Sequence, residues 1–212
     1  MTFDTIEQNK NTDWFRERTI DLFPNVLYFA KPERYFQVSE EVKTALEDVN
    51  WRTKPDWGKT HLMSDPTFKE NFIEKNNLKI FKQEIDHHVG LYAKKHHVVL
   101  KKFTKNYDIL DSWASKFEYG DYGHIQNYGY ADITGIYYYK RPTANNKTGN
   151  IFFNPSGSGF TSNTLYRKLV RSAFYFPEGT LLLFPGFLSH GFASNEVDRE
   201  TITVTFNIKL RT

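Results

Sequence analysis

The spacing of hydrophobic residues changes about half-way along the chain. Before residue 98 apolar side chains recur at helical intervals, whereas after it they fall in short runs that alternate with polar residues. The clearest helical segment runs from about Leu78 to Lys95, where one face carries apolar residues at intervals of 3, 4, 4 and 3, namely Leu78, Phe81, Ile85, Val89 and Tyr92. We therefore expect a helical N-terminal part followed by a β-rich part.

Two further elements are expected before this helix. Residues 22–29 form an apolar run with Pro24 near its start, which predicts a first strand because proline is tolerated there. A helix should follow, with Ser39 as its N-cap and with Glu40 and Glu41 in the first turn. Its apolar stripe would consist of Val42, Leu46 and Val49.

The second half of the chain contains eight short β runs separated by Gly, Pro and Asn. They lie near residues 112–119, 122–128, 132–139, 149–154, 171–176, 180–184, 188–193 and 200–209. Strands at this spacing, without intervening helices, predict a sandwich or jelly roll. A Gly- and Ser-rich stretch at 155–170 separates the fourth and fifth runs, and loops of this kind often form lids or substrate walls.

Length and composition fit one domain of ordinary globular character. Residues 1–105 would be an N-terminal helical elaboration with one strand, and residues 106–210 the β core of the single domain 1–212. Aromatic residues make up 17% of the chain, which suits both sheets and clefts for planar or apolar ligands. The net charge of +3 is mildly basic and does not indicate a nucleic-acid partner.

The sequence contains no cysteine, which excludes disulfides, thiolate metal sites and cysteine nucleophiles. A reducing cytoplasm fits this composition. No signal peptide is recognisable at the start, and no stretch approaches eighteen apolar residues, so no membrane span is expected.

Two histidines and a late arginine are the candidate functional residues. In a double-stranded β-helix His124 would lie on the second strand and His190 on the seventh, so both would meet at one open end. Arg199 follows His190 by nine residues, and Thr201 shares its face of the eighth strand by alternation. Two imidazoles with an oxygen donor suit Fe(II), and a guanidinium beside a hydroxyl suits the far carboxylate of a dicarboxylic acid. No further catalytic side chain is predicted.

Each candidate also has a structural interpretation. His124 and His190 could be hydrogen-bonded cavity histidines, and Arg199 could pair at the surface with Glu196 or Asp198. Four histidines at or beyond the long helix have no carboxylate arranged around them and are expected to be solvated or to lie at the edge of the core: His87, His88, His96 and His97.

Seven segments, in this order and spacing, resemble the Fe(II)/2-oxoglutarate-dependent oxygenases, and more narrowly an oxygenase group common in marine bacteriophage genomes and also found in bacteria. They are Ser112–Trp113, Gly120–Gln126, Asp132–Tyr138, Gly149–Phe153, Leu183–Gly186, His190–Gly191 and Arg199–Asn207, within about residues 110–209. The resemblance implies a double-stranded β-helix (jelly roll, cupin-like) with iron held at the second and seventh strands. It also implies that 2-oxoglutarate, the small-molecule cosubstrate, is held by Arg199 and by Tyr138 on the third strand. A phage-encoded chain would work in the cytoplasm of the host.

One position departs from the family pattern. Relatives carry His, Asp or Glu two residues after the first histidine, whereas this chain has Gln126, whose amide oxygen can ligate a metal but brings no negative charge. Iron would therefore be held less tightly. Asp121, Asp132, Tyr128 or a water are the alternatives for the third position, with Asp121 expected in a turn and Asp132 expected to cap the next strand.

Gln126 leaves two functions open. The chain would be an oxygenase that hydroxylates an unidentified substrate, a protein side chain by family analogy, with release of succinate and CO2. Alternatively it would be a catalytically impaired relative that acts as a binding or structural module. A metal-dependent isomerase or another cupin is a third hypothesis, and it would not need Arg199.

Overall fold

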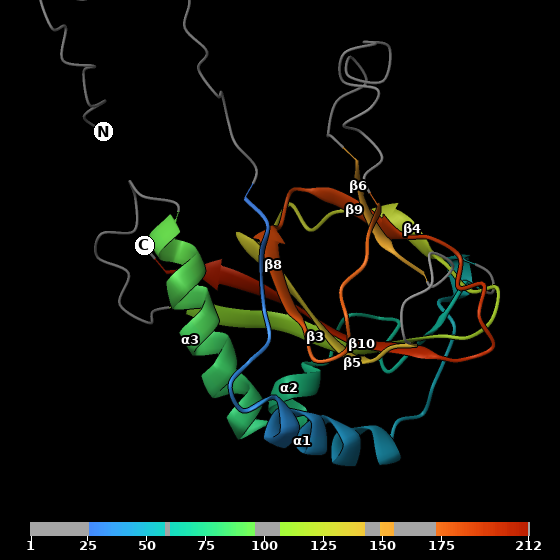
Figure 1. Ribbon diagram of the computed structural model, residues 1–212, viewed down its shortest axis with the longest axis horizontal. Coiled ribbons are helices and arrows are strands. Elements are labelled where there is room, and N and C mark those ends of the chain that lie inside the picture. Colours follow the sequence, from blue (N-terminus) through green and yellow to red (C-terminus); the bar gives the residue numbers. More distant parts are fainter. Residues whose placement is uncertain (1–25, 58–59, 96–106, 143–148, 155–172, 212) are drawn as a thin grey trace, which may run out of the picture.

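The computed structural model describes residues 26–57, 60–95, 107–142, 149–154 and 173–211. Its centre is a pair of antiparallel sheets that face each other, with helices on the outer side of the larger one (Figure 1). The larger sheet has the strand order β1-β8-β5-β10-β3-β2, in which β1 spans Tyr28–Ala30 and β2 spans Leu62–Met63, and the smaller sheet has the order β4-β9-β6-β7.

The chain passes back and forth between the two sheets. The larger sheet holds β3 (Tyr107–Phe117), β5 (Ile133–Lys140), β8 (Leu181–Pro185) and β10 (Thr201–Leu210). The smaller sheet holds β4 (Gly123–Gln126), β6 (Ile151–Asn154), β7 (Ala173–Phe174) and β9 (Ser189–Phe192). This alternation is the double-stranded β-helix, so the predicted fold class and its eight strands are confirmed.

Three helices cover the outer face of the larger sheet (Figure 1): α1 (Tyr35–Glu47), α2 (Phe72–Lys75) and α3 (Lys79–Lys95). Helix α3 matches the helix that the apolar spacing predicts, and all five residues of its predicted face are buried. Its first turn is held by Glu41 of α1, whose carboxylate accepts hydrogen bonds from the backbone N–H groups of Ile80 and Phe81 at 3.0 and 2.9 Å. A carboxylate at this position satisfies N–H groups that the helix itself cannot.

The two faces of β10 have different partners. Ile202, Val204, Phe206 and Ile208 are buried, and the last three pack with the helices in the outer core. Phe206 fills the space above Gly135 of β5, where a Cβ atom would lie 2.0 Å from its ring, so only glycine fits. The opposite face of β10 is polar yet buried, with Thr201, Thr203, Thr205 and Asn207 turned towards the space between the sheets.

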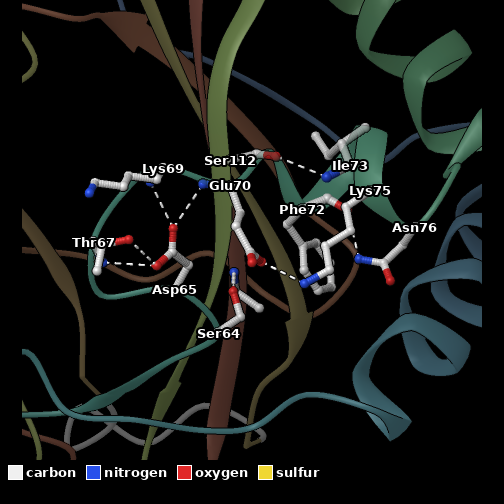
Figure 2. A network of polar contacts seen from close by, with 11 residues as sticks. Ser64, Asp65, Thr67, Lys69, Glu70, Phe72, Ile73, Lys75, Asn76 and Ser112 are labelled. Carbon is white, nitrogen blue, oxygen red and sulfur yellow. Dashed lines mark hydrogen bonds and ion pairs between the residues drawn. The ribbon is translucent and has the colours of Figure 1, made fainter.

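The segment between β2 and α3 is tied to the barrel by a polar network (Figure 2). Burial opposes ionisation of Asp65, but hydrogen bonds from Thr67, Lys69 and Glu70 outweigh it and lower the pKa of this carboxyl to about 2. The Ser112 hydroxyl of β3 accepts the N–H of Ile73 at 2.9 Å, which fixes α2 against the sheet.

Three expectations for the N-terminal part need correction. Helix α1 begins at Tyr35, so Ser39 is not its N-cap; the Ser39 hydroxyl instead lies 2.8 Å from the hydroxyl of Tyr137 on β5. The N-terminal part contributes two strands to the larger sheet rather than one, β1 (Tyr28–Ala30) beside β8 and β2 (Leu62–Met63) beside β3. The predicted first strand is shifted, because only Tyr28–Ala30 pairs, while residues 22–25 lie outside the described residues.

The predicted loop at 155–170 also lies outside the described residues, so its role as a lid or substrate wall stays a prediction. Among the helices of the described ranges, none is long and apolar enough to cross a membrane.

Candidate functional site

His190 stands near the start of β9 and is buried between the sheets. It is 1% exposed, and its ring packs against the rings of Phe184 and Tyr128 at centroid distances of 4.8 and 5.6 Å. Its Nδ1 lies 2.9 Å from the carbonyl oxygen of Leu188, which can only accept, so Nδ1 carries the proton. Burial lowers the pKa of His190 to about 4, so the ring is neutral at pH 7 with Nε2 as its lone-pair atom. This is the form of histidine that binds metals.

Gln126 is the residue paired with His190 in the β4–β9 ladder. Residues opposite each other in an antiparallel pair project to the same side of the sheet, so the Gln126 amide and the His190 ring are neighbours. Gln126 also lines a hollow of about 450 Å³, whose other lining residues are Lys54, Phe68, Asp111, Asn127, Tyr128 and Tyr130. The predicted third metal position thus opens onto a space large enough for a small ligand. A larger hollow of about 790 Å³ lies between α1 and the start of α3, away from these residues.

His124 lies in β4 where the pairing with β9 shifts register, between Gly123 and Gln126. Its half-buried ring packs against Tyr122 at a centroid distance of 5.2 Å. The structure therefore places His124 beside Tyr122, whereas His190 packs among Phe184, Tyr128 and Phe153. Within the described ranges, no group of three or more His, Cys, Asp or Glu side chains is arranged to hold a metal ion. Ligation by His124, Gln126 and His190 stays a prediction.

A third histidine, His61, lies close to His124 and was not predicted as a site residue. It is buried and stacks on Phe117 at 4.7 Å with an interplanar angle of 14°. Burial is the main cause that lowers its pKa to about 4, and the nearby charge of His124 adds to the effect. His61 stands in an irregular stretch between Pro55 and Pro66, so no periodic signal in the sequence could have placed it.

Two of the alternative ligands for the third position, Asp121 and Asp132, are engaged elsewhere. One Asp121 oxygen accepts the N–H of Glu118 at 2.8 Å, in the turn after β3. Asp132 accepts the N–H of Leu210 at 2.8 Å and pairs with Lys209 at 3.0 Å, at the end of β10. The Tyr128 hydroxyl is buried, and burial raises the pKa of this phenol well above its usual value although Gln126 opposes the shift. Tyr128 is therefore a neutral phenol at pH 7.

Three buried hydroxyls lie on the neighbouring strands β5 and β10. Tyr138 and Thr203 are partners in the β5–β10 ladder, and Thr201 lies two residues before Thr203 on the same face. Their exposed fractions are 0%, 0% and 2% for Tyr138, Thr203 and Thr201. Among the described residues none of these hydroxyl oxygens has a hydrogen-bond partner. Leaving such a group unsatisfied costs about 1–3 kcal/mol, so three together indicate a place for a polar ligand.

Arg199 was expected to point inward on the face of Thr201, but the structure places it at the surface. It is exposed, in the bend that precedes β10. Its carbonyl oxygen accepts the Asn195 side-chain amide at 2.9 Å, and the same amide nitrogen lies 3.2 Å from the carbonyl oxygen of Phe117. The backbone at Arg199 is thus fixed to the end of β3, while its guanidinium lies at the surface.

Arg141, which follows β5 directly, is the buried arginine of this region. It is 5% exposed, and its guanidinium carbon lies 5.0 Å from the ring centroid of Tyr138 and 4.4 Å from that of Tyr175. Its Nη1 donates to the Phe176 carbonyl at 2.8 Å, and its Nη2 donates to the Asn150 side-chain oxygen at 2.8 Å. Burial raises the pKa of Tyr138, and the positive charge of Arg141 partly offsets that rise. Arg141 lies just beyond β5, so no period in the sequence marks it as buried.

Sequence reasoning also missed a buried polar network that joins β3, β5 and β10. Asp111 of β3 accepts hydrogen bonds from Asn207 and Tyr130, both at 2.8 Å, and Thr134 donates to Asn207 at 2.8 Å. Burial is the main cause that raises the pKa of Asp111.

The helix histidine His88 is buried against Tyr28, whose hydroxyl lies 2.8 Å from its Nδ1, so it lies at the edge of the core as expected. His96 and His97 lie outside the described residues.

Solved structures with a similar fold include proteins that depend on 2-oxoglutarate or bind it. SnoN, a non-heme alpha-ketoglutarate-dependent epimerase from nogalamycin biosynthesis, gives a TM-score of 0.62 at 10% identity over 89% of this chain and 79% of SnoN. A 2OG-Fe(II) oxygenase family oxidoreductase from Burkholderia pseudomallei gives 0.61 at 7% identity over 86% and 84%. HygX from Streptomyces hygroscopicus, with nickel and 2-oxoglutarate bound, gives 0.60 at 10% identity over 88% and 83%.

The chain has the fold of the 2-oxoglutarate oxygenases. No protein-family model and no curated protein matches the sequence. At 7–10% identity the likeness to the oxygenases is one of fold, so the roles of individual residues rest on the geometry of this chain.

Proposed function

We propose that this chain is an Fe(II)- and 2-oxoglutarate-dependent oxygenase that hydroxylates a substrate and releases succinate and CO2. The observation that carries the proposal is the set of three buried hydroxyls without partners at Tyr138, Thr201 and Thr203, in a double-stranded β-helix that also buries a neutral histidine. A carboxylate accepts hydrogen bonds from all three hydroxyl groups and removes their desolvation penalty. The donor set therefore fits 2-oxoglutarate.

The metal would be held by His190, by Gln126 opposite it and by His124 on the same strand. His190 offers Nε2 of a neutral ring, and Gln126 offers an uncharged amide oxygen. His124 would have to turn from Tyr122 towards His190. When bound, Fe(II) and 2-oxoglutarate together supply the activation of dioxygen that hydroxylation requires. The rings of Phe184 and Tyr128 around His190 exclude water from this position.

The cosubstrate would lie with its distal carboxylate at Tyr138 and Thr201. The sequence resemblance assigns the cation for this carboxylate to Arg199, which would have to turn inward from its exposed position. The primary substrate would enter the hollow at Gln126, whose aromatic lining suits a protein side chain or another group of similar size. The narrower likeness to phage oxygenases, with action in the cytoplasm of the host, belongs to the same proposal.

Anaerobic calorimetry tests the proposal directly. Protein loaded with Fe(II) should bind 2-oxoglutarate, and on admission of oxygen it should form succinate in proportion to the 2-oxoglutarate consumed. Thr201→Val and Tyr138→Phe should each weaken 2-oxoglutarate binding about tenfold, because each removes one hydrogen bond to a charged group. Failure of the unsubstituted, iron-loaded protein to bind 2-oxoglutarate would rule the proposal out.

A second candidate is the catalytically impaired relative that acts as a binding or structural module. It is favoured by Gln126, which brings no charge to the metal, and by the absence of a group of three ionisable ligands among the described residues. In this case 2-oxoglutarate or another dicarboxylate would bind equally well with and without Fe(II), and no succinate would form. Metal-dependent binding would exclude this alternative.

A further inference from the structure

We propose that Arg141, rather than Arg199, supplies the positive charge that binds the distal carboxylate of 2-oxoglutarate. This inference rests on the proposed function, and it assigns a residue that the sequence resemblance does not. The argument starts from the three buried hydroxyls, since the cation that serves them has to lie beside them.

Arg141 lies beside the Tyr138 ring. Its guanidinium carbon is 5.0 Å from the Tyr138 ring centroid, and its charge partly offsets the rise that burial causes in the pKa of Tyr138. Tyr138 in turn pairs with Thr203 in the β5–β10 ladder, and Thr201 lies on the same face of β10. A carboxylate held by these hydroxyls would therefore lie close to the Arg141 charge.

The Arg141 guanidinium is also fixed in place before any ligand arrives. Phe176 and Asn150 accept hydrogen bonds from Nη1 and Nη2 at 2.8 Å, and the Gly149 carbonyl lies 3.4 Å from Nη2. The ring of Tyr175 lies 4.4 Å from its guanidinium carbon. A preorganised cation loses little conformational entropy on binding, and in a water-poor interior its charge acts more strongly than at the surface.

Arg199 has neither property. Its side chain is exposed, and the bend that carries it is fixed through its carbonyl oxygen by Asn195. Turning inward would order a long side chain that solvent now surrounds, which costs side-chain entropy. Arg141 binds the carboxylate without this rearrangement.

The two arginines are distinguished by a pair of ligands that differ only in the distal carboxylate. 2-Oxoglutarate and 2-oxobutyrate share the oxoacid end, and only 2-oxoglutarate carries the second carboxylate. In anaerobic protein loaded with Ni(II), which does not turn over, calorimetry should show that 2-oxoglutarate binds at least tenfold more tightly. Arg141→Gln should abolish this preference and leave 2-oxobutyrate binding unchanged, whereas Arg199→Gln should keep the preference.

A second variant tests the inference independently, in case Arg141→Gln does not fold. Asn150→Asp is isosteric and places a carboxylate where the amide oxygen now accepts from Arg141, so the guanidinium is neutralised while its contacts are retained. It should lower the affinity for 2-oxoglutarate about tenfold or more, without loss of melting temperature and without change in 2-oxobutyrate binding.

The outcomes separate this inference from the proposed function. Loss of the preference in Arg199→Gln, or unchanged 2-oxoglutarate affinity in Asn150→Asp, overturns the assignment of Arg141 while the oxygenase proposal stands. If the unsubstituted protein with Ni(II) binds neither oxoacid, the proposed function itself fails.

Discussion

Gln126 and His190 are directly opposite each other in the β4–β9 ladder, so an uncharged amide stands where the neighbouring strand presents a neutral imidazole. Both groups offer a lone pair, and neither offers a negative charge. In the proposed metal site the missing negative charge would therefore lower the affinity for a divalent cation.

Gln126→Asp should raise the affinity for a divalent metal, because it replaces an uncharged amide with a negatively charged carboxylate at the same position of β4. We expect an increase of about tenfold, equivalent to ~1.4 kcal/mol, in Ni(II) titrations followed by calorimetry. Asn127→Asp is the matched control, since it adds the same charge to the next residue, which is exposed and lines the same hollow. Equal gains in the two variants would show that Gln126 has no special position towards the metal.

The metal-free protein should lose stability as the pH falls from about 6.5 to about 4. Burial holds the pKa of both His190 and His61 at about 4, against the ordinary histidine value of 6.5, so each ring is neutral in the folded state at pH 7. The unfolded chain binds these protons first, and the loss is therefore complete only below the folded pKa. Each ring should contribute up to about 3 kcal/mol to this loss.

Urea unfolding of metal-free protein at pH 7 and at pH 4.5 measures this effect. His190→Gln should reduce the difference in unfolding free energy between the two pH values, because the substituted side chain does not titrate. His87→Gln, which removes an exposed histidine from α3, serves as the control. A pH difference that is the same in His190→Gln and in the unsubstituted protein contradicts the prediction.

Gly135→Ala should destabilise the fold by about 1–3 kcal/mol, because the added Cβ would overlap the Phe206 ring at 2.0 Å and the core is closely packed. Thermal or urea unfolding provides the measurement. Gly90→Ala in α3 is a control of opposite sign, since a Cβ there meets nothing within 4 Å and alanine favours the helix by about 0.5–1 kcal/mol. A neutral Gly135→Ala would mean that Phe206 moves aside without strain.

Ser39→Ala and Tyr137→Phe should be non-additive, because the two hydroxyls are 2.8 Å apart and form one hydrogen bond between α1 and β5. Each substitution should lower the unfolding free energy by about 1 kcal/mol, and the double variant should lose little more than either alone. If Ser39 acted only on its own helix, the two losses would add.

Periodicity alone predicted most of the fold. The spacing of Leu78, Phe81, Ile85, Val89 and Tyr92 predicted α3, and the short alternating runs predicted the eight strands of the barrel. These signals are local, since a helix or strand that buries one face has to repeat its apolar residues at the period of its own backbone. The start of α1 was not predictable in this way, because the Ser39 hydroxyl is engaged by Tyr137, a residue far away in the sequence.

The candidate site was predicted only in part. Alternation correctly placed Thr201 on the buried face of β10, and the likeness to the oxygenases pointed to Tyr138, which the structure buries beside it. The same alternation fails at Arg199, because the strand begins at Thr201 and the bend before it is held by Asn195. A period is informative only where the backbone is regular.

The sequence by itself thus predicted the double-stranded β-helix, its N-terminal helices and two hydroxyls of its polar interior, those of Thr201 and Tyr138. Only the tertiary structure decided which arginine is buried beside those hydroxyls and which histidine is buried between the sheets. The physical reason is that burial at Arg141 and His190 results from contacts between segments distant in the chain, such as Phe176 with Arg141 and Phe184 with His190. Such contacts leave no repeat in the sequence.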